Sequence, residues 1–386
     1  MCKERYRALL VFALTIVCTL MYFAYNNRFA RIDTNQSVLA EESAALEVSG
    51  TSQGSAVEQT GVEAGDGEHE NESENDVHMV VPCGTPIGIY VKTQGVMVID
   101  TSTITASDGK ACSPCAGLLE QGDYIVSING IAVEDKNDLI ALVEESGGES
   151  LQIGVVRDEA DITVTVKPVQ NDDNRYMLGL WVKDDISGIG TLTYVDEDGF
   201  GALGHSINDN DTGVAFNISD GAIYDANLVN VVKPSGRNPG RLEGMIDYSS
   251  EHIIGRVETN SSYGIQGYIT KHGTESLTQA EWIPVARKDE AHLGDAYLLS
   301  AVSGKPEYYQ IEITGIDISN TEGGKGLEIQ VTDPDLLAIT NGIVQGMSGT
   351  PIIQDGKLLG AVTHVFLKDA TKGYGTFIES MMYESD

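Results

Sequence analysis

The chain has 386 residues, a formal net charge of −34 and a pI near 4.3. A surface this acidic repels polyanions, so it excludes nucleic-acid binding, which requires clustered lysine and arginine. The length is sufficient for two or three folded units with hydrophobic cores. The 43 glycines and the 6% of aromatic residues indicate a turn-rich, mainly β protein with few long helices.

The first predicted element is a membrane anchor within residues 1–31. Residues 8–25, ALLVFALTIVCTLMYFAY, carry no charge, and at about 1.5 Å per residue they are long enough to cross a bilayer as a transmembrane helix. Basic residues precede this segment and an acidic stretch follows it. We therefore expect the N-terminus in the cytoplasm and the bulk of the chain on the extracytoplasmic side. The alternative is a signal peptide that is cleaved near LAEESAA.

An acidic, disordered tether is predicted over residues 32–78. No lysine or arginine occurs between residues 32 and 90, and much of the tether consists of Gly, Ser, Glu, Asp and Asn. Such a coil has a root-mean-square span of roughly 35 to 40 Å. The tether is also an accessible place for proteolytic cutting.

Residues 79–170 are predicted to form a small α/β domain. The sequence reads as strands and a helix around LLEQGDYIVSINGIAVEDKNDLIALV, with Asn129-Gly130 as a type I′ hairpin turn. This order resembles a PDZ domain of the bacterial protease-associated kind. The resemblance implies a loop that offers backbone N–H groups to a peptide carboxylate, so that a C-terminal or internal peptide adds as an extra strand. The matching residues are Thr85, Pro86, Ile87, Gly88 and Ile89. The alternative is a small domain without a ligand.

Residues 172–386 show many short strands separated by Gly, Asn and Asp, without helical periodicity. This pattern predicts a β-sandwich or a pair of barrels. Within it, the stretch VQGMSGTPIIQDGKLLGAV places Ser348 between Gly346 and Gly349. The N–H groups of Gly346 and Ser348 could then face one point, as an oxyanion hole requires. A hairpin bend without chemistry is the alternative.

A nucleophilic serine needs a base, and the chain has seven histidines. His205, in FGALGHSINDNDTG, ends an apolar strand where the chain enters a polar turn, which is a favourable position for a catalytic side chain. His364, in GAVTHVFL, is expected to be half-buried structure and is the weaker candidate. The other five are expected to be in the tether or to be solvated or locally bonded: His69, His78, His252, His272 and His292.

Taken together, GALGHSI and QGMSGTP resemble the two halves of a chymotrypsin-like site, with the histidine on one barrel and the serine on the next. These two segments, the PDZ-like domain and the N-terminal anchor are together similar to the stage IV sporulation protein B family of serine peptidases. The resemblance implies a chymotrypsin-like double β-barrel with His205 as general base and Ser348 as nucleophile. It also implies the N–H groups of Gly346 and Ser348 as the oxyanion hole.

The acid behind His205 is less well defined. The family motif points to VTDPDLL and therefore to Asp333, with Asp335 as the near alternative. Asp333 next to Pro334 is also typical of a turn in which the carboxylate bonds its own backbone. Further acids that could replace it are Asp209, Asp211 and Asp220.

The family resemblance further implies a function. Such proteins cross the inner spore membrane, act in the spore intermembrane space, cut themselves and cleave a membrane protein that starts a transcription-factor cascade. It implies no cofactor and no metal. Two alternatives remain: a non-catalytic, PDZ-containing adaptor with a degenerate protease fold, and a thiol or metal protein built on Cys112 and Cys115, which form a CSPC motif.

Overall fold

The computed structural model describes residues 30–33, 78–197, 199–210, 212–236, 238–277, 281–319 and 324–383. The predicted anchor and tether lie outside these residues, apart from the short strand β1 (Ala30–Asp33), which pairs with β14 (Arg241–Ile246), and His78. Within the described part of the chain, no helix combines the length and the apolar character needed to cross a membrane.

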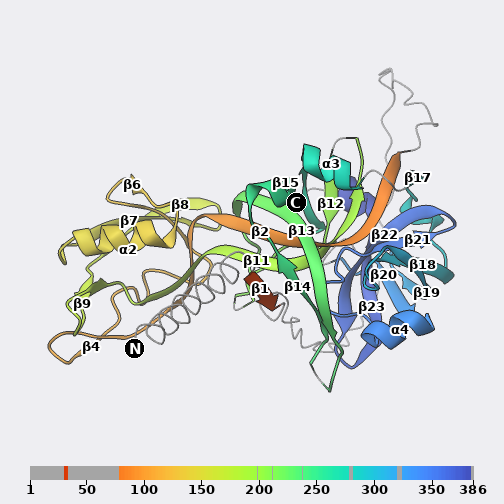
Figure 1. Cartoon of the computed structure of the whole chain (residues 1–386). Coiled ribbons are helices and arrows are strands. Elements are labelled where there is room, and N and C mark those ends of the chain that lie inside the picture. Colours follow the sequence, from red (N-terminus) through yellow and green to blue (C-terminus); the bar gives the residue numbers. More distant parts are fainter. Residues whose placement is uncertain are drawn as a thin grey trace, which may run out of the picture.

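Two long antiparallel strands, β2 (Met79–Thr101) and β11 (Leu180–Val195), organise the fold. Figure 1 shows them running from the PDZ-like part on the left into the barrels on the right. The first half of β2 is almost entirely buried. One pair of strands therefore joins the two folded parts, in place of a flexible linker.

The PDZ-like part surrounds a core of its own, built from aliphatic residues such as Val98, Ile125 and Ile153. The Asp135 carboxylate caps helix α2 by accepting hydrogen bonds from the N–H groups of Asn137 and Asp138. The predicted hairpin turn is confirmed, because Asn129 and Gly130 have φ values of 51° and 80°. Its elements are β3 (Ile104–Thr105), β4 (Ala111–Cys112), β5 (Tyr124–Ile128), β6 (Ile131–Ala132), α2 (Lys136–Glu145), β7 (Leu151–Arg157), β8 (Ala160–Val166), β9 (Val169–Gln170) and β10 (Tyr176–Met177).

The prediction for the peptide-binding loop of this domain is wrong. Thr85, Pro86, Ile87, Gly88 and Ile89 lie inside β2, where they pair with β11 along one edge. Ile87, Gly88 and Ile89 also pair with β13 (Ile218–Val232) along the other edge. A segment held between two strands in this way cannot present its N–H groups to a peptide carboxylate. These residues are therefore part of the first barrel of the peptidase part and do not form a binding edge of the PDZ-like part.

The first barrel closes through six strands, because β13 pairs with both β15 (Ile253–Ser261) and β2. Around the ring these strands are β2, β11, β12 (Phe200–Ala202), β16 (Gly264–Ile269), β15 (Ile253–Ser261) and β13. The turn η2 (Ser250–His252) precedes β15, and helix α3 (Lys271–Leu277) follows β16.

The second barrel is also closed and six-stranded. Figure 1 shows it at the right of the molecule. Around the ring its strands are β18 (Gly294–Ser300), β19 (Glu307–Ile316), β20 (Leu327–Val331), β23 (Asp369–Phe377), β22 (Lys357–Phe366) and β21 (Pro351–Gln354). Three further elements accompany it: β17 (Ile283–Pro284), α4 (Pro334–Thr340) and α5 (Ile378–Tyr383). One apolar cluster contains Ile189 and Tyr224 of the first barrel together with Met347 and Ile352 of the second. The two barrels therefore share a core at their contact, as expected for a chymotrypsin-like fold.

Candidate active site

His205 lies three residues after the end of β12, at the rim of the first barrel. The chain leaves the strand through Leu203 and Gly204, both in the left-handed region with φ values of 72° and 74°. A β-carbon on Gly204 would lie 3.1 Å from Cγ2 of Thr363 in the second barrel. The sequence GALGHSI therefore contains the glycine that lets the histidine loop approach the neighbouring barrel closely.

Ser348 lies in the turn that leads into β21 of the second barrel. Gly346 and Gly349 both have a φ of 93°, a conformation that favours glycine. A β-carbon on Gly349 would collide with the carbonyl oxygen of Thr191 and lie 2.5 Å from the amide nitrogen of Leu203. The serine turn thus packs directly against the strand end that carries His205.

Two buried threonines of β11 hold the serine turn in place. The hydroxyl of Thr191 donates to the Gly346 carbonyl over 2.8 Å, and that of Thr193 donates to the Gly349 carbonyl over 2.7 Å. The Thr191 N–H donates to the Ser348 carbonyl over 3.0 Å. Sequence reasoning missed both threonines, although their alternate positions in GTLTYV would have indicated one shared, inward face of a strand.

His205 has one hydrogen bond that determines its chemistry. Its Nδ1 lies 2.8 Å from the Ser206 carbonyl oxygen, so Nδ1 carries the proton and donates to that oxygen. The second ring nitrogen, Nε2, then has a free lone pair, and it is buried without a hydrogen-bond partner within the described residues. Burial lowers the pKa of His205, and the bond to the Ser206 carbonyl opposes this shift. A neutral imidazole with an available lone pair is what a general base requires.

His364 lies closer to the site than the sequence indicated. Its ring centroid is 5.3 Å from that of His205, with an angle of 37° between the rings. Burial lowers the pKa of His364 to about 3, with smaller contributions from His205 and Lys325. His364 therefore stays neutral at physiological pH and packs against the ring of His205.

The Ser348 hydroxyl donates to the carbonyl oxygen of Thr363 over 2.9 Å. Thr363 directly precedes His364 on β22, so the serine hydroxyl bonds to the backbone of the strand that carries His364. For the N–H groups of Gly346 and Ser348, no backbone partner is recorded within the described residues.

The structure gives Asp333 a different role from the predicted one. One oxygen of its carboxylate accepts from the N–H groups of Asp335 and Leu336, and the other from the N–H of Gln310. Asp333 is thus the N-cap of helix α4 and does not support His205. The alternative turn interpretation, in which this aspartate bonds the backbone next to Pro334, was correct.

The other candidate acids have partners of their own. Asp209 is buried, pairs with Lys183 at 2.5 Å and accepts from the Thr212 N–H, while Asp220 lies 3.6 Å from Arg256. Asp335 is exposed on the first turn of α4, and Asp211 lies outside the described residues. Within those residues, the groups that shift the pKa of His205 include no carboxylate. The Ser206 carbonyl takes the position where a triad acid would stand.

Cys115 of the CSPC motif is not an activated thiol. Both cysteines are free, and burial raises the pKa of Cys115 to about 12. A thiol with such a pKa is not a nucleophile at neutral pH. Cys115 packs in the core of the PDZ-like part.

Comparison with known proteins completes the assignment. Residues 174–382 match the family described as SpoIVB peptidase S55, which is more than half of the chain, and residues 107–157 match the PDZ domain family. The chain belongs to the SpoIVB peptidase S55 family. It is therefore a serine peptidase with a PDZ domain.

Several solved structures are similar in part. The PDZ domain of the SdrC-like protein from Listeria monocytogenes is 19% identical, with 24% of this chain and 90% of that chain covered and a TM-score of 0.20. The protease Rv3671c from M. tuberculosis H37Rv, in its inactive form, is 17% identical over 49% of this chain and 78% of that chain, with a TM-score of 0.23. The HtrA-type protease AlgW with a decapeptide is 10% identical over 78% of this chain and 61% of that chain, with a TM-score of 0.28. No curated protein sequence matches.

Proposed function

We propose that the chain is a membrane-anchored serine endopeptidase in which Ser348 is the nucleophile and His205 the general base. One observation carries this proposal: the turn of Ser348 and the loop of His205 meet at the contact between the barrels, and the Nε2 lone pair of His205 is unused. The membership of a serine peptidase family supports it.

The reaction requires one change in the serine side chain. The Ser348 hydroxyl must leave the Thr363 carbonyl and turn toward His205, whose Nε2 then takes its proton as the oxygen attacks the scissile carbonyl. The N–H groups of Gly346 and Ser348 stabilise the oxyanion of the tetrahedral intermediate. His205 afterwards gives the proton to the leaving amine. Throughout, the Ser206 carbonyl keeps Nδ1 as the protonated nitrogen.

The family resemblance and the acidic segment support a proposal for the substrate and the setting. We propose that residues 32–78 contain a self-cleavage site and that a second cut, in a membrane protein, starts sporulation signalling toward a transcription-factor cascade. Anchoring by residues 1–31 would keep the peptidase on the extracytoplasmic side, in the spore intermembrane space. The PDZ domain would bind a C-terminal or internal peptide by strand addition.

The test is incubation of the full-length chain in detergent, wild type beside Ser348→Ala, followed by mass measurement of the products. We expect N-terminal truncation of the wild type only, and labelling of Ser348 by a fluorophosphonate probe. Self-cleavage that persists in Ser348→Ala after removal of contaminating proteases would refute the role of Ser348.

A non-catalytic adaptor is the second candidate function, and two observations favour it. The Ser348 hydroxyl bonds to Thr363, and the Ser206 carbonyl, which carries no full charge, stands behind His205. Removal of the charged acid from a serine triad lowers kcat by about 10⁴-fold. An adaptor would show neither self-cleavage nor fluorophosphonate labelling in the wild type, while it would still bind a peptide through the PDZ domain.

A further inference from the structure

Three metal-binding side chains converge on the outside of the first barrel, apart from the residues assigned to catalysis. They are Asp225 of β13, His252 of η2 and His272 of α3, which come from three separate segments. One oxygen or nitrogen atom from each lies within 4.8 Å of the others. No sequence motif groups these residues, because 20 or more positions separate each from the next.

The distances fit a small metal ion. Nε2 of His272 lies 2.8 Å and Nδ1 of His252 lies 3.9 Å from the same oxygen, Oδ2 of Asp225. In a tetrahedral zinc site with bonds near 2.0 Å, neighbouring ligand atoms are roughly 3.3 Å apart. The two observed distances lie on either side of this value, and one ligand atom of each residue lies within 4.8 Å of the other two.

A fourth residue orients one of the ligands. Nε2 of His252 points toward Asp247, whose Oδ2 is 3.6 Å away and whose side chain is only 12% exposed. Nδ1 of His252 is thereby left to face Asp225. Metal-binding histidines commonly have a carboxylate on their other nitrogen, which fixes the ring and increases its basicity.

We propose that Asp225, His252 and His272 bind one zinc ion, with water as the fourth ligand and Asp247 as the partner of His252. Two imidazoles and a carboxylate favour zinc over calcium and magnesium, which prefer oxygen ligands. The three side chains are 41 to 43% exposed, so the ion can enter from solvent. The bound ion would cross-link α3, η2 and β13, and it would therefore stabilise the barrel that carries His205.

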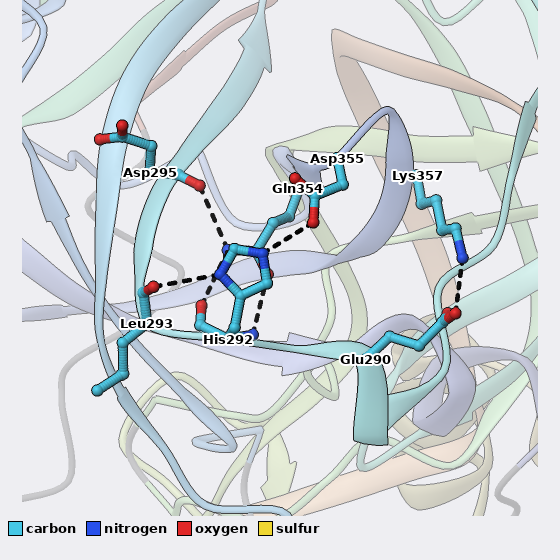
Figure 2. Close-up of polar contacts among 7 residues, drawn as sticks. All are labelled: Glu290, His292, Leu293, Asp295, Gln354, Asp355 and Lys357. Carbon is cyan, nitrogen blue, oxygen red and sulfur yellow. Dashed lines mark hydrogen bonds and ion pairs between the residues drawn. The ribbon is translucent and has the colours of Figure 1, made fainter.

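The chain offers a matched control in His292 and Asp355. Figure 2 shows this pair, in which Nε2 of His292 lies 2.8 Å from Oδ2 of Asp355, the same distance as in the pair of His272 and Asp225. The other nitrogen of His292 contacts the Leu293 carbonyl and the Gln354 amide. Within the described residues, this pair belongs to no cluster of three potential ligands.

The experiment is a zinc titration of the full-length chain, without an affinity tag, in competition with a chromophoric chelator. The parent carries Ser348→Ala to prevent self-cleavage and Cys112→Ser with Cys115→Ser to remove the CSPC thiols. We expect one equivalent of zinc, at least 100-fold weaker binding in His252→Ala and in His272→Ala, and unchanged binding in His292→Ala. Asp247→Asn should weaken binding by about 10- to 100-fold.

A second readout separates lost ligands from lost folding. Without metal, circular dichroism should be the same for the parent and for Asp225→Asn, which keeps the side-chain shape. Zinc should then raise the melting temperature of the parent and leave that of Asp225→Asn unchanged. Equal zinc affinity in the parent and in Asp225→Asn, or no binding by the parent, would overturn the proposal.

Discussion

In two regions of the molecule the surroundings of a histidine shift its pKa, and the two shifts have opposite directions. At the barrel interface, defined by His205, Ser348 and His364, burial lowers the pKa of both histidines. At the outer turn, defined by His292, Asp355 and Gly356, the Asp355 carboxylate raises the pKa of an exposed histidine (Figure 2).

This difference separates a catalytic arrangement from a surface ion pair. The outer turn contains the histidine–aspartate pair that a search for triads would select, but it joins the segment before β18 to the turn between β21 and β22, at the opposite end of β21 from Ser348. The barrel interface has no such carboxylate among the groups that shift the pKa of His205, yet it brings the serine turn and a neutral imidazole together. Location at the contact of two rigid barrels is therefore the better guide to the site than the presence of an ion pair.

The largest expected effect is on peptide cleavage, and it appears when His205 and His292 are each replaced by glutamine. His205→Gln should lower kcat/KM for a cleaved peptide by about 10⁴-fold, because the general base is lost. His292→Gln should leave kcat/KM within about threefold. Both are measured by steady-state cleavage with the full-length protein. A similar loss of kcat/KM in the two variants would contradict the assignment of catalysis to the barrel interface alone.

The second effect concerns stability and compares a glycine in each region. Gly349→Ala adds a β-carbon that collides with the Thr191 carbonyl at a φ of 93°, so we expect a loss of more than about 3 kcal/mol in the free energy of unfolding. Gly356→Ala, at a φ of 74° with open space around it, should cost only about 1 kcal/mol.

Urea unfolding of both glycine variants in the Ser348→Ala background measures the difference. Equal losses would show that the close approach of the two barrels at Gly349 contributes nothing to stability.

The third effect tests the reassignment of Asp333. As an N-cap, Asp333→Ala should cost about 1 kcal/mol of stability and reduce kcat by no more than a few-fold. As the acid of a triad, the same change would lower kcat by about 10⁴-fold. Asp335→Ala is the control, because Asp335 is exposed and contributes only its N–H to the cap. A loss of activity near 10⁴-fold with unchanged stability would restore the original prediction.

The sequence predicted those features that depend on local chemistry. The Asn129-Gly130 turn follows from the need for positive φ, and the strand-rich character of the barrels follows from alternation. The segments of His205 and Ser348 were paired by family pattern, and the structure brings their loops together.

The remaining features depend on contacts between distant segments, which alternation does not specify. The first half of β2 reads as a PDZ strand, but its partners, β11 and β13, are about 100 or more residues away. His364 resembled an ordinary strand residue because its neighbour, His205, lies on another barrel. Asp333 had both a catalytic and a capping interpretation, and only the position of Gln310 and the start of α4 decides between them.

The smallest expected effect is a pH dependence at the outer turn. Asp355 is the first cause of the raised pKa of His292, followed by the Leu293 carbonyl, so the folded state holds the proton more tightly than the unfolded state does, where the ordinary pKa is 6.5. The pair therefore stabilises the fold fully below pH 6.5, and this contribution is lost as the pH rises through the folded pKa. Asp355→Asn should remove the larger part of it, because the bond to the Leu293 carbonyl remains.

We expect the difference in the free energy of unfolding between the Ser348→Ala parent and its Asp355→Asn derivative to be larger at pH 5.5 than at pH 8.5. Because both side chains are more than half exposed, solvent screening keeps this difference small. High salt should reduce it further. The barrel interface provides the contrast, since burial lowers the pKa of His205 and His364, so protonation of either opposes folding. The prediction would be wrong if the parent became less stable than Asp355→Asn as the pH falls, because the ion pair would then not stabilise the folded state at low pH.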